Sequence, residues 1–225
     1  MAFAGYDYVG LDMQHGLIDY AGCVRGLTAI DAAGAAGLVR VPSNDPAWIG
    51  RVLDAGAQAV IVPLVNSAAQ AGRAASACRY PPVVVRSYGP MRSALRIGPA
   101  PRLADDAVAC IVMIETRDGL DGIEAICAVP GVDAVYIGPS DLALALGGDQ
   151  PSAAATLPDF EPALERVRTV AEKAEIAVGI HCVDGQAAAG ALAAGFTMVT
   201  IANDLNHLAT VAATHLAAAR EGRTR

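Results

Sequence analysis

Ionisable side chains follow several apolar runs of the sequence, each at the point where the run ends. His15 and Arg40 stand at the ends of the first two runs, and Glu115 and Asp141 follow two later ones. Two carboxylates without a lysine or cysteine beside them form an oxygen-only site that suits Mg²⁺ or Mn²⁺. The alternative is that each carboxylate caps a helix or pairs with an arginine such as Arg117. Because Glu115 and Asp141 occupy equivalent positions after two apolar runs, we favour the metal site over this alternative.

Three further side chains have types and positions that suggest a role. His15 is a candidate proton-transfer group because a neutral imidazole titrates near working pH, although a lone loop histidine more often has no catalytic role. The guanidinium of Arg40 matches a carboxylate or an enolate-carboxylate pair. Asp54 lies late in a predicted helix, where an acid opposes the helix dipole, so it needs a partner. The single lysine, Lys173, lies in a polar helical stretch, which rules out a Schiff-base aldolase.

Short β-branched apolar runs alternate with alanine-rich helical stretches. The runs are nearly continuous in apolar character, which is typical of parallel strands covered on both faces. The predicted strands are Tyr8–Met13, Leu38–Val41, Ala59–Val62, Cys110–Ile114, Ala134–Ile137, Ala177–Ile180 and Met198–Ile201. The predicted helices are Pro46–Ala55, Ala68–Cys78, Gly119–Val129, Phe160–Lys173, Asp184–Ala194 and Leu208–Glu221. The pattern predicts an α/β fold, a (β/α)8 TIM-type barrel, and not an open doubly wound sheet.

The predicted barrel is a single domain over residues 1–225 with a C-terminal helix at about 207–222. Only seven strands are evident. Val83–Val85 is β-branched but follows Pro82 and precedes a loop with glycine and proline, and 150–158 reads as a loop. We therefore expect that the first strand-helix unit of the barrel is missing from this chain. In such barrels the strand ends that carry His15 and Arg40 form the rim of one bowl.

Composition excludes several classes of protein. Hydrophobic residues make up 54% of the chain, which excludes a disordered protein, and the net charge of −7 argues against nucleic-acid binding. The five cysteines are scattered and contain no Cys-x-x-Cys pair, so we expect reduced thiols and a cytoplasmic location. No signal peptide is evident. The charge-free stretches 55–72 and 185–203 contain proline or glycine, so no membrane span is predicted.

Several segments, in order over about residues 5–205, resemble the HpcH/HpaI aldolase family of class II, metal-dependent pyruvate aldolases. These segments are Asp12–Gly16, Val39–Pro42, Leu53–Gln58, Val62–Pro63, Arg79–Pro82, Ile114–Thr116 and Gly138–Leu142. The resemblance implies a (β/α)8 barrel assembled as a homo-oligomer, a hexamer or trimer, with C-terminal helices exchanged between subunits. Members usually carry an additional N-terminal strand and helix, in agreement with the strand count.

The resemblance also implies roles for the candidate residues. Glu115 and Asp141 would hold a divalent cation, namely Mg²⁺, Mn²⁺ or Co²⁺. Arg40 would contact the oxygens of pyruvate and its enolate. His15, oriented by Asp54, would form the catalytic acid/base dyad.

The implied substrates are a small 2-oxo acid and an aldehyde. The backbone amides of Ser140 and Asp141 would bind the pyruvate carboxylate, and Gly138 would permit its close approach. The implied reaction is reversible cleavage of a 4-hydroxy-2-oxo acid to pyruvate and an aldehyde, through a metal-bound pyruvate enolate.

Some positions depart from the family pattern. Many members have Glu where Gln14 stands and Gln where Met113 stands, so substrate affinity or specificity is expected to differ. Val84 and Ser87 replace glycines that often surround the family's arginine after the double proline, so the loop Arg86–Arg92 is expected to shape a different aldehyde pocket.

Two alternatives remain open from sequence. A citryl- or malyl-CoA lyase-like enzyme shares the barrel and the metal chemistry, although its ligand would need a basic rim for the CoA phosphates. The other alternative is a non-catalytic or truncated barrel subunit.

Overall fold

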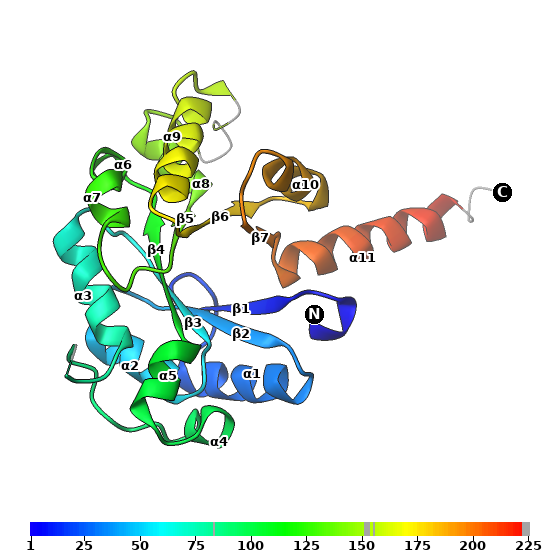
Figure 1. The fold of residues 1–225 in the computed structure, drawn as a ribbon. Coiled ribbons are helices and arrows are strands. Elements are labelled where there is room, and N and C mark those ends of the chain that lie inside the picture. The colour runs from blue at the N-terminus through cyan, green and yellow to red at the C-terminus, as the bar shows by residue number, and fades with distance from the viewer. Residues whose placement is uncertain (83, 151–153, 155, 222–225) are drawn as a thin grey trace.

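Seven parallel strands form one sheet in the order in which they occur in the chain (Figure 1). The computed structural model describes residues 1–82, 84–150, 154 and 156–221. The strands are β1 (Tyr8–Asp12), β2 (Ala36–Arg40), β3 (Ala59–Val62), β4 (Ala109–Ile114), β5 (Ala134–Ile137), β6 (Ala177–Cys182) and β7 (Met198–Ile201). The sheet curls into a nearly closed barrel, which confirms the predicted fold class, and seven strands are consistent with a missing first unit.

Helices follow the strands and cover the outside of the sheet (Figure 1). After the short 3-10 helix η1 (Ala2–Ala4), they are α1 (Tyr20–Ala32), α2 (Pro46–Asp54), α3 (Ala68–Cys78), α4 (Ala94–Ile97), α5 (Pro101–Ala107), α6 (Arg117–Asp121), α7 (Ile123–Cys127), α8 (Pro139–Ala145), α9 (Phe160–Lys173), α10 (Gly185–Ala193) and α11 (Asp204–Glu221). Several begin at a side chain that accepts a hydrogen bond from the first turn, as Asp45 does from the Ala47 amide and Thr116 from the Gly119 amide. These capping hydrogen bonds set the residue at which each helix begins after the loop that follows a strand.

Alternate residues of each strand pack on the two sides of the sheet. The interior of the barrel holds one buried cluster, made of Leu38, Ala59, Ile61, Ile111, Met113, Ala134 and Tyr136. The intervening residues, such as Val39, Val60, Val112 and Val135, pack against the helices in a larger cluster. Strands β3 and β5 are buried along their whole length, as parallel strands covered on both faces should be.

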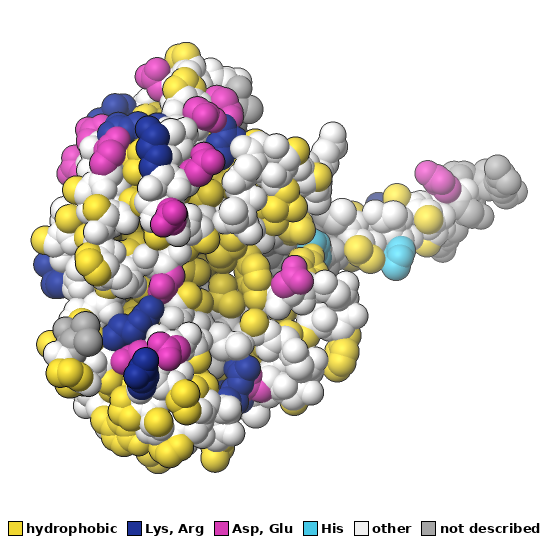
Figure 2. Space-filling model, in the orientation of Figure 1, with side chains coloured by type: hydrophobic (Ala, Val, Ile, Leu, Met, Phe, Trp, Pro, Cys, Tyr) yellow, Lys and Arg dark blue, Asp and Glu magenta, His cyan; other side chains and the backbone are white. Residues whose placement is uncertain are grey.

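Strands β1 and β7 are the two ends of the sheet and are only partly buried. They are not hydrogen-bonded to each other as strands, but the Tyr8 hydroxyl donates to the Val199 carbonyl across the gap at 2.5 Å. Beyond β7, helix α11 extends away from the body and has no buried residue (Figures 1 and 2). Hydrophobic side chains lie exposed along it, among them Leu208 and Val211.

Most predicted elements are present, and some bounds differ. The predicted helix Gly119–Val129 is two short helices, α6 and α7, which meet at Gly122. The C-terminal helix begins at Asp204, earlier than predicted, and its expected end at 222 lies outside the described residues. Of the expected loops, residue 83 and residues 151–153 and 155 also lie outside them.

None of the described helices is both long enough and apolar enough to cross a membrane. The five cysteines are free and buried.

Candidate active site

Arg40 and Asp12 form a two-point ion pair at the carboxyl ends of β2 and β1. The two residues are paired in the strand register. Nε of Arg40 donates to Asp12 Oδ1 at 2.8 Å and its Nη2 donates to Oδ2 at 2.5 Å. Burial alone would raise the pKa of Asp12, but the hydrogen bond and the charge of Arg40 outweigh it and lower that pKa. The guanidinium is thereby fixed at the rim, and the structure identifies Asp12 as the residue that orients it.

Glu115, directly after β4, carries a buried carboxylate with one unpaired oxygen. Its side chain is 2% exposed, and Oε1 accepts a hydrogen bond from the Leu64 amide at 2.8 Å. Oε2 has no hydrogen-bond partner among the described residues. Burial raises the pKa of Glu115, assisted by the negative charge of Asp141 and opposed by the Leu64 hydrogen bond. A buried carboxylate oxygen that has no hydrogen-bond partner is typical of a cation ligand.

Four of the residues singled out in the sequence meet at this point. Asp141, Arg40 and His15 are the charged groups that act on Glu115, so all four lie around one bowl. Asp141 is exposed in the first turn of α8, and His15 is exposed in the loop after β1. The His15 backbone amide donates to Asp12 Oδ1 at 3.3 Å, which ties that loop to the rim.

The donor set fits a divalent cation. Among the described residues no three His, Cys, Asp or Glu side chains gather into a metal cluster. Glu115 and Asp141 would therefore share the ion with water and substrate oxygens, which is the usual arrangement for Mg²⁺.

Gly138 leaves room beside the Glu115 carboxylate. A Cβ at this position would lie 2.5 Å from Glu115 Oε2 and 3.0 Å from the Met113 methyl. The first backbone hydrogen bond of α8 runs from the Leu142 amide to the Gly138 carbonyl. The preceding amides of Ser140 and Asp141 therefore have no helical acceptor and are available to an anion at this rim.

Replacing Gly138 by alanine is therefore expected to displace the Glu115 carboxylate. We expect Gly138→Ala to weaken Mn²⁺ binding by about 10- to 100-fold, the range found when groups that orient metal ligands are lost. Isothermal titration calorimetry with Mn²⁺ measures the change. Gly190→Ala on α10 is the matched control, because a Cβ there would meet no atom within 4 Å apart from the backbone of its own helix. Equal affinities for the two variants would show that Glu115 does not need this space.

Asp54 does not lie near His15 within one chain, so the expected dyad is not formed inside a single subunit and stays a prediction. Helix α2 begins after the carboxyl end of β2 and leads to the start of β3, so its last residue, Asp54, lies at the opposite end of the strands from His15. There the Asp54 carboxylate accepts a hydrogen bond from Arg86 at 2.8 Å. The sequence predicted that Asp54 needs a partner, but it could not indicate which part of the fold supplies one.

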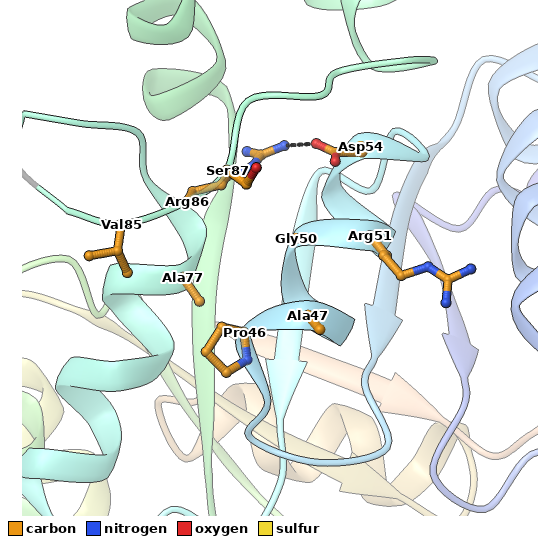
Figure 3. A pocket seen from close by; sticks show the side chains of 9 residues that line it. All are labelled: Pro46, Ala47, Gly50, Arg51, Asp54, Ala77, Val85, Arg86 and Ser87. Atoms are coloured by element: carbon orange, nitrogen blue, oxygen red, sulfur yellow. Dashed lines mark hydrogen bonds and ion pairs between the residues drawn. The ribbon is translucent and has the colours of Figure 1, made fainter.

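The Asp54–Arg86 pair borders a hollow on the outside of the barrel (Figure 3). The hollow has a volume of about 330 Å³ and lies between the exposed face of α2, the end of α3 and residues 85–87. Arg86 is buried, with its guanidinium 4.4 Å from the centre of the Tyr80 ring. The loop Arg86–Arg92, expected to shape an aldehyde pocket, thus begins away from the bowl that holds Glu115.

Removing the charge of Asp54 is expected to destabilise the fold. Asp54→Asn would leave the Arg86 guanidinium buried without a carboxylate, a loss of about 3 kcal/mol in the free energy of unfolding. Urea denaturation measures it. Asp106→Asn, an exposed position on α5, is the control and should change stability by less than about 0.5 kcal/mol. If the two variants are equally stable, the buried pair does not hold this loop.

Comparisons with known proteins identify relatives of this chain. Residues 1–210 match the sequence profile described as HpcH/HpaI aldolase/citrate lyase. A hydroxypyruvate/pyruvate aldolase of Rhizorhabdus wittichii is 42% identical over 221 residues, which cover 98% of this chain and 88% of that protein. A 5-keto-4-deoxy-D-glucarate aldolase of Klebsiella pneumoniae is 34% identical, over 91% of this chain and 80% of its own.

A solved structure has the same fold. An HpcH/HpaI aldolase/citrate lyase family protein from Burkholderia cenocepacia superposes with a TM-score of 0.89 at 34% identity, and the match covers 97% of this chain and 88% of that one. This similarity shows that the two chains share the same fold. The chain belongs to the HpcH/HpaI aldolase/citrate lyase family.

Proposed function

We propose that this protein is a class II aldolase that cleaves a 4-hydroxy-2-oxo acid to pyruvate and an aldehyde, and that catalyses the reverse addition. The observation that carries the proposal is the buried Glu115 carboxylate, which has one oxygen unpaired and lies within reach of the charges of Asp141, Arg40 and His15. The aldolase names of the relatives from R. wittichii and K. pneumoniae support the same class of reaction.

The 2-oxo acid would be bound at three points. The fixed guanidinium of Arg40 donates to the 2-oxo oxygen, and the amides of Ser140 and Asp141 donate to the carboxylate. Glu115 and Asp141 would hold a divalent cation, which when bound supplies a Lewis acid for the negative charge that develops on the 2-oxo oxygen. Mg²⁺, Mn²⁺ and Co²⁺ each suit an oxygen-rich site of this kind with open positions.

His15 would move the proton. In the cleavage direction it takes the proton of the 4-hydroxyl group, directly or through one water. The bond between carbons 3 and 4 then breaks, and its electron pair goes to the 2-oxo acid as an enolate while the aldehyde leaves. Protonation of carbon 3 gives pyruvate. The exposure of His15 suits this role, because the group must meet both the substrate and water.

We further propose that the working protein is a homo-oligomer. Helix α11 has exposed Leu205, Leu208 and Val211 and no buried residue, and such an apolar surface is typical of a subunit interface. Since Asp54 lies far from His15 within one chain, it could orient that imidazole only from a neighbouring copy. Mixing His15→Ala with Asp54→Asn subunits tests this: activity above that of either parent supports the shared site, and no recovery contradicts it.

The proposal is tested by pyruvate release from 4-hydroxy-2-oxo acids. We expect cleavage with added Mg²⁺, Mn²⁺ or Co²⁺ and its loss with EDTA, restored by excess metal. Unchanged turnover in EDTA would refute the metal-dependent mechanism.

A citryl- or malyl-CoA lyase activity is the second candidate, because the matching family includes citrate lyases. Citryl-CoA and malyl-CoA in the same assay distinguish it. Cleavage of these thioesters in preference to hydroxy-oxo acids would replace the aldolase assignment.

A further inference from the structure

The loop after β3 contains a leucine in a backbone conformation that leucine rarely adopts. Leu64 has a φ of 54°, in the left-handed region that glycine and asparagine occupy more easily. Its side chain is 52% exposed although its neighbours Pro63 and Val65 are buried, so burial of the leucine does not offset the backbone strain. Residues held in such conformations are concentrated at functional sites. A role that requires this conformation would explain the strain.

The contact made by the backbone at this position is a hydrogen bond to Glu115. The Leu64 amide donates to Glu115 Oε1 at 2.8 Å. The left-handed turn allows the amide to point at the carboxylate while the chain turns and places the next residue, Val65, in the core, where it is fully buried. With an ordinary negative φ at residue 64, either the amide or Val65 would have to leave its place.

The loop is also fastened to the helix that begins just after Glu115. The Thr116 hydroxyl donates to Asn66 Oδ1 at 2.5 Å, and the same hydroxyl oxygen accepts a hydrogen bond from the Gly119 amide in the first turn of α6. The Val65 carbonyl packs so closely on Gly119 that a Cβ there would lie 2.8 Å from it. These contacts fix the loop relative to the Glu115 carboxylate.

The two oxygens of this carboxylate face different neighbouring strands. Oε1 of Glu115 is bonded to the loop after β3, on one side of β4. Oε2 lies beside Gly138, which follows β5 on the other side of β4, and a Cβ there would come within 2.5 Å of it. Asp141 is three residues further along the chain. The amide therefore occupies one oxygen, and the oxygen without a partner among the described residues is the one on the side of Asp141.

The number of carboxylate oxygens that a site offers distinguishes Ca²⁺ from Mg²⁺. Ca²⁺ takes more oxygen ligands and often binds both oxygens of one carboxylate, whereas Mg²⁺ requires a nearly octahedral shell and keeps several of its waters. A carboxylate that offers a single oxygen therefore suits Mg²⁺ better than Ca²⁺.

We propose that the left-handed turn at Leu64 keeps Glu115 a one-oxygen ligand and thereby favours Mg²⁺ over Ca²⁺ at the cation site. The inference rests on the proposed function, which places a divalent cation at Glu115 and Asp141. Leu64 is a positioning residue. A cation that needs both oxygens of Glu115 has to displace the Leu64 amide and move a loop that Asn66 and Thr116 hold in place.

Displacement of bound Mn²⁺, followed by electron paramagnetic resonance, measures the affinities for Mg²⁺ and Ca²⁺ without turnover. Isoleucine has the same atoms as leucine but branches at Cβ, which makes a left-handed conformation less favourable. We expect Leu64→Ile to shift the ratio of the two affinities toward Ca²⁺ by about 10- to 100-fold, the range by which groups that orient metal ligands change metal affinity.

Two matched variants separate the backbone conformation from the side chain. Leu64→Asn tolerates the left-handed conformation and should keep the ratio within about threefold of the wild type. Leu192→Ile, at a similarly exposed leucine of α10, makes the same exchange away from the site and should leave the ratio unchanged. A shift in Leu64→Asn as large as that in Leu64→Ile would show that the side chain matters and would overturn the inference.

A second variant and a spectrum test the same contact, also if Leu64→Ile does not fold. Asn66→Ala removes the acceptor of the Thr116 hydroxyl and loosens the loop, so it should shift the ratio in the same direction. Infrared difference spectra of Mg²⁺ binding should show a carboxylate bound through one oxygen in the wild type, and this signal should be absent from Glu115→Gln.

The two levels of the argument fail differently. If the wild type binds no Mn²⁺, or if Glu115→Gln binds it equally well, the proposed cation site is wrong. If the wild type binds Mn²⁺ through Glu115 but folded Leu64→Ile and Asn66→Ala keep its Mg²⁺ to Ca²⁺ ratio, or if the spectra show a carboxylate bound through both oxygens, the inference about Leu64 is wrong and the aldolase assignment stands.

Discussion

Glu115→Gln is expected to lower kcat/KM for aldol cleavage by about 1000-fold or more, the range seen when a principal electrostatic group of a site is removed. The amide keeps the size of the side chain and can still accept the Leu64 hydrogen bond, but it loses the charge that would hold the cation. Coupled detection of pyruvate measures the loss. Glu172→Gln, an exposed carboxylate on α9, is the control.

The same substitution should stabilise the metal-free protein. Because burial raises the pKa of Glu115 above 4.5, its ionised form is less favourable in the folded protein than in the unfolded one. Glu115 contributes to the stability of the folded protein when the pH is below the pKa that this group has in the unfolded chain. This contribution is lost as the pH rises through the higher pKa that the group has in the folded protein. In EDTA at pH 8 we therefore expect Glu115→Gln to unfold at a higher temperature than the wild type, with no such advantage near pH 4.

If Glu115→Gln is inactive and also unfolds at a lower temperature than the wild type in EDTA, the Glu115 carboxylate has a structural role. Full activity would remove Glu115 from the proposed mechanism.

Arg40→Lys is expected to lower kcat/KM by about 100-fold, which corresponds to about 2.7 kcal/mol. Lysine keeps the positive charge but replaces a planar two-point contact with a single ammonium, so neither Asp12 nor the 2-oxo acid is bound in the same geometry. Because the effect concerns substrate binding, we expect KM for the 2-oxo acid to rise. Steady-state kinetics over a range of 2-oxo acid concentrations measures it.

The variant also has a pH signature. Hydrogen bonding by Arg40 lowers the pKa of Asp12 below 3.8, despite burial, so ionised Asp12 stabilises the fold above that pH and this contribution is lost as the pH falls through the lowered pKa. Arg40→Lys should reduce this stabilising contribution of ionised Asp12. Arg166→Lys, in a partly exposed pair with Glu124, is the matched control and should change neither rate nor stability. Wild-type kinetics in Arg40→Lys would contradict the proposed role.

The bowl could be predicted from sequence because it depends on strand ends. The apolar run before Glu115 is rich in β-branched residues, Arg40 follows the shorter run Leu38–Val39, and parallel strands bring their carboxyl ends to one rim. Asp12 could have been identified in the same way, since it ends the strand next to that of Arg40.

Other features depend on tertiary geometry that no local pattern carries. Asp54 stands in a motif close in sequence to Arg40, yet one helix of nine residues takes it to the other end of the barrel. The contact between Tyr136 and Thr200 passes over a glycine of the intervening strand, which cannot be inferred before the register is known. The break between α6 and α7 depends on Gly122, where the helical pattern continues but the chain turns.

Mn²⁺ binding followed by electron paramagnetic resonance is the most direct test of the shared cation site. The account predicts one tight Mn²⁺ per chain in the wild type, with the bound fraction abolished in Glu115→Gln, strongly reduced in Asp141→Asn and unchanged in Glu172→Gln. Wild-type Mn²⁺ affinity in both Glu115→Gln and Asp141→Asn would contradict it.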